Sequence, residues 1–209
     1  MYRETCSGTY SNFMYGISKL IVDIVLNAVN ACLMFACYYY QCGLRDDAPS
    51  VLYALFMTFL GTWVMVSIAQ LCAFSCPNEE TATALCSVIF ILFTEFSGMA
   101  ISYEEQPDYW IWAYMIDIAH YISQGFVTNE FVGQSYFLFE YQIAGPVTKD
   151  FYISGERVLN YYGWADEDSD GNYIAPYKWD YCVVYVVYTI IAVEILKLFA
   201  ICFITWTKR

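Results

Sequence analysis

The chain has 209 residues, and its composition excludes an ordinary soluble protein. Hydrophobic residues make up 59%, aromatic residues 20% and charged residues 14%, against about 25% charged residues in typical globular domains. The net charge of −12 argues against nucleic acid as a partner, because phosphate binding requires a basic surface. Most acidic residues, 13 of 21, lie between Glu104 and Asp180, and nearly uncharged stretches long enough to cross a bilayer flank them.

Four apolar stretches predict four membrane-spanning helices. They cover about 17–44, 51–74, 81–103 and 181–206. Each is long enough, because about 20 helical residues cross the hydrocarbon core. The fold class is therefore an all-α polytopic membrane protein.

The segment between the last two spans predicts a different arrangement. Residues 107–127 are apolar, but they are too short and too polar for a crossing, so we expect an outer re-entrant helical hairpin. Residues 128–179 predict a polar extracellular loop with little strand. Its acidic run at 166–171 lacks the Glu that closes a calcium-binding loop, so we expect no metal site.

Four crossings place both termini on one side of the membrane. Basic residues cluster on that side at Arg3, Lys19, Lys208 and Arg209, which makes it cytoplasmic by the positive-inside rule. We therefore expect a multi-pass protein of the plasma membrane, with residues 207–209 as a cytoplasmic tail and the acidic loop outside.

Short motifs follow one another along almost the whole chain. They are Tyr2-Arg3-Glu4, Gly8-Thr9-Tyr10, Lys19 to Asp23, Pro77-Asn78, Phe96-Ser97-Gly98, Asn129-Glu130-Phe131 and Ser154-Gly155-Glu156. In this order and spacing they resemble the second half of the transmembrane domain of G-subfamily ABC transporters, which include pleiotropic-drug-resistance and sterol exporters. The resemblance implies a cytoplasmic coupling segment at 1–16 and an ABC-2 type transmembrane domain at 17–206.

The resemblance also implies a function. The chain would be the substrate-translocating module of an ATP-driven exporter of lipids, sterols or hydrophobic compounds. A second transmembrane half, identical or different or on the same polypeptide, would pair with it. No phosphate-binding G-x-x-x-x-G-K-[ST] loop occurs, so we expect no enzymatic activity and no cofactor on this chain. ATP and Mg would be bound by a nucleotide-binding domain elsewhere, unless the chain is a fragment.

Four residues are expected to couple the membrane domain to that ATPase. Arg3 and Glu4 lie in the coupling segment, and Lys19 and Asp23 lie four residues apart on one helical face. For the second pair, a purely structural ion pair is the alternative.

The resemblance places the substrate cavity on two spans. The expected lining residues are Asn27, Val88, Ile91, Thr94 and Glu95, with Met99 at the outer gate. Glu95 is a carboxylate expected in mid-span, where charge is costly and commonly functional. It either lines the cavity or is buried between helices.

Two further polar pairs occur within the predicted spans. Glu194 and Lys197, at i,i+3 spacing, are expected to pair and to extend toward the inner interface. Asn27 and Asn30 share a helix face, where amides hydrogen-bond between helices or form a polar spot in the cavity.

Two other functions stay open. One is a non-transporting membrane scaffold or an inactive transporter fragment. The other is an ion-coupled carrier that uses Glu95 and Glu194, which is disfavoured because no inverted repeat is visible.

Overall fold

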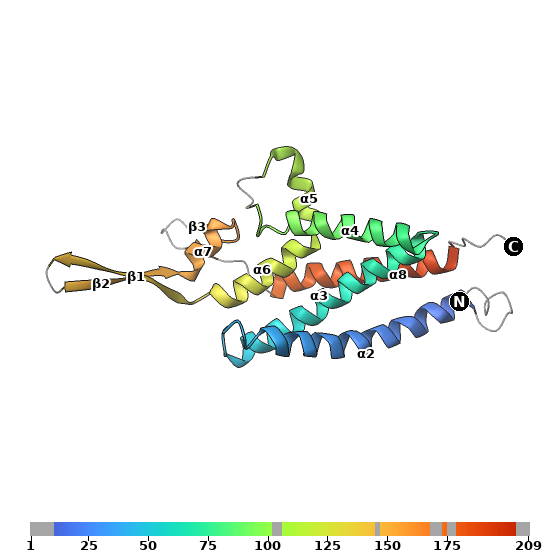
Figure 1. Cartoon of the computed structure of the whole chain (residues 1–209), viewed down its shortest axis with the longest axis horizontal. Coiled ribbons are helices and arrows are strands. Elements are labelled where there is room, and N and C mark those ends of the chain that lie inside the picture. The colour runs from blue at the N-terminus through green and yellow to red at the C-terminus, as the bar shows by residue number, and fades with distance from the viewer. Residues whose placement is uncertain (1–10, 102–105, 145–146, 168–172, 175–178, 204–209) are drawn as a thin grey trace. The chain divides into compact units, whose positions relative to one another are not determined.

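The computed structural model describes residues 11–101, 106–144, 147–167, 173–174 and 179–203. The chain divides into two compact units. The first unit contains Met1–Leu44, Leu55–Leu92 and Tyr185–Arg209, and the second contains Arg45–Ala54 and Phe93–Val184. Figure 1 shows the elements in chain order, and each unit is described by itself below.

Long helices build the first unit. They are α2 (Asn12–Tyr38), α3 (Ala48–Ser75), α4 (Glu79–Glu95) and α8 (Val184–Phe203). Helix α2 begins where Ser11 caps it, with the Ser11 hydroxyl accepting a hydrogen bond from the Met14 backbone N–H at 3.3 Å. Helix α4 follows the turn at Pro77, where proline ends helical structure.

Among the described residues, three helices are long and apolar enough to cross a membrane: Asn12–Tyr38, Ala48–Ser75 and Tyr181–Phe203. The stretch predicted to span at 81–103 is helical only as α4, which has 17 residues and ends at Glu95. The predicted span is therefore shorter than expected, because Ser97-Gly98 follows as a turn and Gly98 has a positive φ of 78°. The chain is thus a helical membrane protein with three clear candidate spans.

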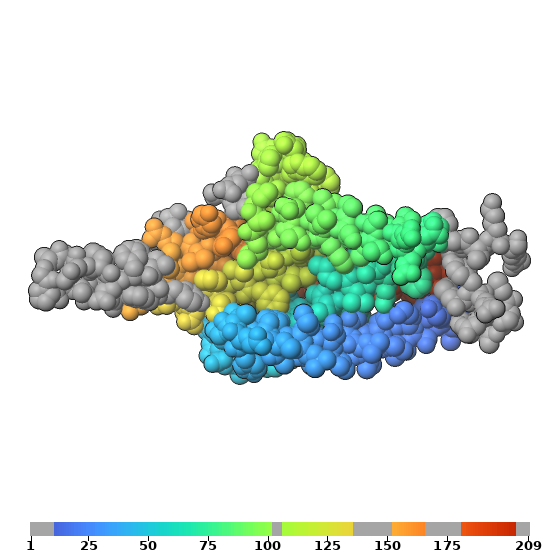
Figure 2. Space-filling view, viewed as in Figure 1, coloured from blue at the N-terminus to red at the C-terminus, as the bar shows by residue number. Residues whose placement is uncertain are grey.

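Helices α2 and α8 bury one stripe and leave many residues exposed, whereas α3 is mostly buried or half-buried. Helix α2 buries residues at intervals of four, including Ala31 and Phe35, while Val25 and Leu33 on other faces are exposed. This pattern suits helices in lipid, which can leave apolar side chains outside and must satisfy their backbone within the helix. Figure 2 shows such exposed surface along α2 and α4.

Two short helices occupy the segment predicted as a re-entrant hairpin. After the 3₁₀ turn Asp108–Trp110, α5 (Ile111–Ile116) and α6 (Ile118–Phe131) are separated only by Asp117. Asp117 has extended backbone, and its side chain accepts a hydrogen bond from the Ala119 backbone N–H at 3.0 Å. The aspartate therefore ends one helix and caps the next.

The segment predicted as a loop with little strand contains strands, so that prediction was wrong for 135–154. Strands β1 (Ser135–Ala144) and β2 (Val147–Ser154) pair as an antiparallel hairpin. Tyr, Phe, Val and Ile dominate both strands, and such residues favour extended pairing. After them come α7 (Gly155–Tyr161), the short pair β3 (Asp166–Glu167) and β4 (Tyr173–Ile174), and a π-helical turn at Trp179–Val183.

The second unit has an aromatic core. Leu159, Trp164 and Ala165 are buried together, and Val127 and Phe131 pack against them. These contacts join α6 to the segment around α7, so the unit's core forms where its helices meet.

Candidate functional site

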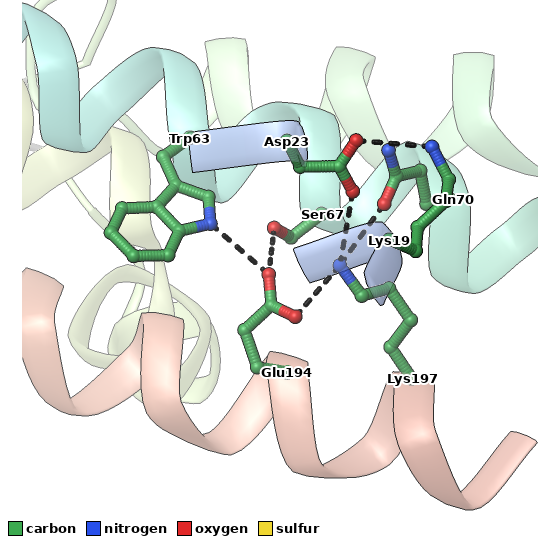
Figure 3. A network of polar contacts seen from close by, with 7 residues as sticks. All are labelled: Lys19, Asp23, Trp63, Ser67, Gln70, Glu194 and Lys197. Carbon is green, nitrogen blue, oxygen red and sulfur yellow. Dashed lines mark hydrogen bonds and ion pairs between the residues drawn. The ribbon is translucent and has the colours of Figure 1, made fainter. Parts of the chain in front are cut away.

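Charged side chains from α2 and α8 lie inside the first unit (Figure 3). On α2, the Lys19 ammonium lies 3.0 Å from the nearer carboxylate oxygen of Asp23. The predicted ion pair is therefore present in the structure. Its two members differ in exposure, since the Lys19 side chain is 32% exposed and that of Asp23 only 6%.

The second charged pair lies on α8 and is fully inside. Lys197 Nζ lies 2.7 Å from Glu194 Oε2, as the i,i+3 spacing predicts. The expectation that this pair extends to the inner interface was wrong, because Lys197 is 0% and Glu194 7% exposed. Polar partners on another helix make the buried position possible.

Those partners come from α3. Glu194 Oε1 accepts hydrogen bonds from Ser67 Oγ at 2.6 Å and from Trp63 Nε1 at 3.1 Å. Lys197 Nζ donates to Gln70 Oε1 at 3.0 Å. Trp63, Ser67 and Gln70 follow one another at intervals of four and three, so they share one face of α3.

One longer contact joins the two ion pairs. Lys197 Nζ lies 3.7 Å from Asp23 Oδ2, so α2, α3 and α8 meet in a single polar cluster. We call these seven side chains the charge network: Lys19, Asp23, Trp63, Ser67, Gln70, Glu194 and Lys197. It contains two cations and two carboxylates and is therefore neutral as a whole.

Neutrality explains why the charge network is tolerated within membrane helices. Burying an ion away from water costs about several kcal/mol, unless close partners of opposite charge compensate. Every charged member has an opposite charge within 4 Å. Loss of one member would leave a buried charge without its partner, so the network makes α2, α3 and α8 depend on one another.

The sequence predicted both ion pairs but not the hydrogen bonds that α3 makes with them. The signal for these hydrogen bonds was the repeat of polar residues at Trp63, Ser67 and Gln70 within an otherwise apolar span. Such residues are not charged, so the count of charges that predicted the spans passed over them.

The predicted cavity residues on α4 lie together on its exposed side. Val88 is 55% and Ile91 61% exposed, and Thr94 and Glu95 are exposed too. Asn27, by contrast, is buried on α2 at 4% exposure, so it does not share this surface. The structure therefore brings four of the five predicted residues together.

Glu95 differs from its predicted position. It is the last residue of α4 rather than a mid-span residue, and its side chain is exposed. Burial of Glu95 between helices of this chain is thus excluded. Met99, the predicted gate residue, is half exposed in the turn that follows.

The remaining predicted polar residues differ in their exposure to solvent, and some lie outside the described residues. Asn30 is exposed while Asn27 is buried, so the expected shared environment of the two amides was wrong. Arg3 and Glu4 lie outside the described residues. Among the residues that the structure describes, no group of His, Cys, Asp and Glu is arranged for a metal ion. Part of the acidic run at 166–171 lies outside that description.

A hollow of about 650 Å³ lies between the end of α3 and the start of α4. Phe74 and Phe90 are among its apolar lining residues, and Glu79 is among its polar ones. Val88, Ile91, Thr94 and Glu95 are not among its lining residues. The hollow and the exposed stripe are therefore separate features of α4.

The Asn129-Glu130 motif has a structural role within the second unit. Asn129 Nδ2 donates to the Ser50 carbonyl at 3.1 Å, and Glu130 Oε2 accepts from the Arg45 backbone N–H at 3.0 Å. The Arg45 guanidinium in turn donates to the Val132 carbonyl at 3.0 Å. The end of α6 is thereby tied to the turn that precedes α3.

The Gly155-Glu156 motif completes the same region. A Cβ on Gly155 would lie 1.8 Å from the Phe131 carbonyl oxygen, so only glycine fits. The Gly155 N–H donates to the Gln134 carbonyl at 2.8 Å, and Glu156 Oε1 accepts from the Gly133 N–H at 2.8 Å. These contacts fix the start of α7 against the end of α6.

Comparisons with known proteins place these features in a family. Residues 1–131 match the family model described as "ABC-2 type transporter". ABC transporter G family member 5 of Dictyostelium discoideum is 25% identical over 217 residues, which cover 97% of this chain and 14% of that protein. ABC transporter G family member 37 of Arabidopsis thaliana is 26% identical over 131 residues, 63% of this chain and 9% of that protein.

A fungal protein gives a similar result. ABC multidrug transporter I of Aspergillus fumigatus is 27% identical over 135 residues, which cover 64% of this chain and 9% of that protein. The chain thus spans about one seventh or less of the length of these relatives. The resemblance drawn from the motifs is confirmed, and the chain belongs to the ABC-2 type transporter family.

Proposed function

We propose that the chain is the substrate-translocating part of an ATP-driven exporter. The observation that carries the proposal is the charge network, because it joins the first half of α2 to α8 through an ionic contact and joins α8 to α3 through hydrogen bonds. The segment at 1–16, whose last five residues begin α2, would receive the movement of a nucleotide-binding domain. The network would pass that movement from α2 to the other two helices.

The proposal includes a topology. Four crossings, with α4 as the third and the α5–α6 pair as a re-entrant hairpin, would place both termini in the cytoplasm. The segment from 128 to 179 would face the outside of the plasma membrane. Domain limits follow as 1–16 for the coupling segment and 17–206 for the transmembrane domain. The apolar length of α2, α3 and α8 supports the membrane part of this scheme.

Substrate contact would occur on the exposed stripe of α4. Val88, Ile91 and Thr94 present an apolar surface with one hydroxyl, and Glu95 ends it with a carboxylate. Such a surface suits lipids, sterols or other hydrophobic compounds, especially where a second transmembrane half closes the other side. The ATP and Mg would be bound by the partner ATPase, and the present chain would carry out no chemical step.

The test begins with the protein in its native membranes. A tagged chain is purified and the copurifying proteins are searched for an ATP-binding cassette. The complex is then reconstituted, and uptake of a fluorescent sterol is measured in inside-out vesicles with and without ATP. ATP-dependent uptake is expected, and acid-driven uptake without ATP would instead favour an ion-coupled carrier. Absence of any ATPase and any uptake would favour the scaffold or inactive fragment.

A variant tests the coupling role separately. Lys19→Gln removes one charge from a partly exposed position, so the complex should still assemble. We expect export per ATP hydrolysed to fall severalfold, because Asp23, through which α2 contacts Lys197 on α8, loses one of its two counter-charges. Tyr40→Phe, at a residue that is 67% exposed beyond the end of α2, is the matched control. Wild-type export by Lys19→Gln would exclude coupling through this pair.

A further inference from the structure

The turn Ser97-Gly98-Met99 rests on a set of aromatic rings in the second unit. Gly98 has a φ of 78°, which favours glycine. A Cβ at this position would lie 3.0 Å from the Trp164 ring, 3.2 Å from the His120 ring and 3.2 Å from the Tyr114 ring. The backbone of the turn is therefore in direct contact with three side chains from distant parts of the sequence.

These three rings form one buried cluster. Trp164 Nε1 donates to Tyr114 Oη at 3.0 Å, and the Tyr114 and His120 ring centroids are 4.1 Å apart. The Trp164 and His120 centroids are 6.0 Å apart. Each of the three side chains is less than 5% exposed. The rings come from α5, from α6 and from the segment after α7, so all three must be in place to enclose Gly98.

The hydrogen bonds that the Ser97 side chain makes are local to the turn. Ser97 Oγ donates to the Thr94 carbonyl at 2.8 Å, and the Met99 backbone N–H donates to Ser97 Oγ at 3.4 Å. They shape the turn. The ring contacts with Gly98 and the contact of His120 with the Ser97 backbone fix its direction relative to α6.

We propose that Tyr114, His120 and Trp164 form an aromatic clamp that positions the Ser97–Met99 turn and thereby controls the outer gate at Met99. The clamp follows from the contacts above, whereas its role at a gate rests on the proposed function. The three residues are positioning residues, since they act on the transported compound only through the turn. Release of the turn would move Met99, which is half exposed.

The clamp has a chemical means of release. Burial lowers the pKa of His120 to about 4, with a backbone contact to Ser97 acting in the opposite direction. The imidazole contacts the rings of Tyr114 on α5 and Tyr121 on α6, and the Asp117 carboxylate interacts with the His120 backbone. Burial raises the pKa of Asp117 to about 7, against hydrogen bonds from the Ala119 and His120 backbone. In strong acid both groups are protonated, and a charged imidazole has no carboxylate beside it.

Hydrogen exchange tests the clamp on the chain itself. The chain is placed in lipid nanodiscs, and exchange is followed in peptides that contain Met99. Trp164→Phe and Tyr114→Phe each remove the Trp164–Tyr114 hydrogen bond while keeping a ring. We expect exchange to rise about three- to tenfold in either variant, as for the loss of one hydrogen bond. The double variant should add little, because both changes remove the same bond.

Matched controls come from exposed rings. Trp112→Phe and Tyr109→Phe alter residues that are 60% and 72% exposed, and they should leave the turn unchanged. His120→Gln tests the titration of the imidazole, because the pH dependence of exchange would not change if His120 contributed only packing. His120→Gln should itself raise exchange at neutral pH, because it removes one ring of the clamp, but only the parent should lose further protection of the turn as pH falls toward 4.

The outcomes separate the clamp from the gate. Unchanged exchange in both Trp164→Phe and Tyr114→Phe, or equal pH profiles of parent and His120→Gln, would overturn the clamp. Faster exchange in these variants with unchanged ATP-driven export would keep the clamp and overturn its role at the gate. Faster exchange in a complex that shows no ATP-driven export would still support the clamp, while the proposed function itself would fail.

Discussion

At the scale of single residues, the structure separates charges that look alike in the sequence. Lys19 and Lys197 both pair with an acid one turn away, yet one is partly exposed and the other is enclosed. The difference arises from their neighbours. Lys197 faces Gln70 on α3 and both carboxylates. The ion pair on α2 and the ion pair on α8 should therefore contribute differently to the free energy of unfolding.

This difference predicts unequal effects of the two lysines on stability. Lys197→Met leaves the Asp23 and Glu194 carboxylates with too little positive charge, and it should lower the free energy of unfolding by about 3–5 kcal/mol. Lys19→Met changes a partly exposed pair and should cost only about 0–1 kcal/mol. Denaturant-induced unfolding in detergent micelles measures both. Equal effects would contradict the assigned burial of Lys197. A second change, Glu194→Gln, should restore part of the stability lost in Lys197→Met.

Asp117 predicts a dependence of stability on pH. Its pKa in the folded chain is raised from 3.8 to about 7 by burial, so the folded state prefers the protonated form. The stabilisation this gives is complete below the unfolded pKa and is lost as pH rises through about 7. Asp117→Asn keeps an acceptor for the Ala119 N–H and does not ionise. The variant should therefore melt at a higher temperature than the parent at pH 8.

The comparison at low pH supplies the control for this experiment. Below pH 4, where Asp117 is protonated in both states, parent and Asp117→Asn should melt alike. Acid weakens both proteins equally through His120, whose pKa is lowered to about 4, because a depressed histidine pKa costs stability as pH falls below 6.5. A constant difference between the two proteins at all pH values would show that Asp117 does not titrate in this range.

At the scale of elements, the helices of the first unit differ in how much they bury. Helices α2 and α8 each bury a full stripe that includes members of the charge network, whereas α4 buries only Ala82. An apolar helix with one buried residue has nearly its whole surface available to lipid or to another helix. This is the element from which a second transmembrane half would gain the most contact.

Cysteines on α2 predict where the helix leaves the hydrocarbon. Cys32 and Cys37 are exposed within the helix, and Cys42 is exposed beyond its end at Tyr38. In nanodiscs, a lipid-soluble maleimide should label all three, and a charged maleimide should label only Cys42. Cys72, which is buried on α3, should resist both reagents. Mass spectrometry of labelled peptides reads the result. Labelling of Cys32 by the charged reagent would place that part of α2 in water.

Local patterns in the sequence predict where the helices form. The residues at which they end depend on contacts between distant parts of the chain, which the sequence does not show. Apolar length predicted α2, α3 and α8, and i,i+4 and i,i+3 spacings predicted both ion pairs. The early end of α4 follows from the aromatic rings that enclose Gly98. The β1–β2 hairpin follows from pairing between strands, which polar side chains along 128–179 obscured. The enclosure of Lys197 required the polar face of α3.

At the scale of the whole molecule, family membership predicts a defined orientation. Cys42 follows the first span, and Cys76 lies in the turn between α3 and α4. If both termini are cytoplasmic, a charged maleimide added to intact cells should label Cys42 and not Cys76. Permeabilised cells should then label Cys76 as well. The inverse pattern would reverse the orientation without changing the helices. Cys42→Ser and Cys76→Ser identify each signal.

The charge network also has a consequence for biosynthesis. Lys19 and Asp23 enter the membrane early, whereas Glu194 and Lys197 are made near the end of the described chain. At roughly 5–20 residues per second, the acid on α2 waits on the order of ten seconds before Lys197 exists. During that interval Asp23 has only Lys19 as a counter-charge, and the polar face of α3 has no acid to bind. Completion of α8 therefore first allows the whole charge network to form. Chains that stop before it would expose polar groups to lipid and be recognisable to membrane quality control.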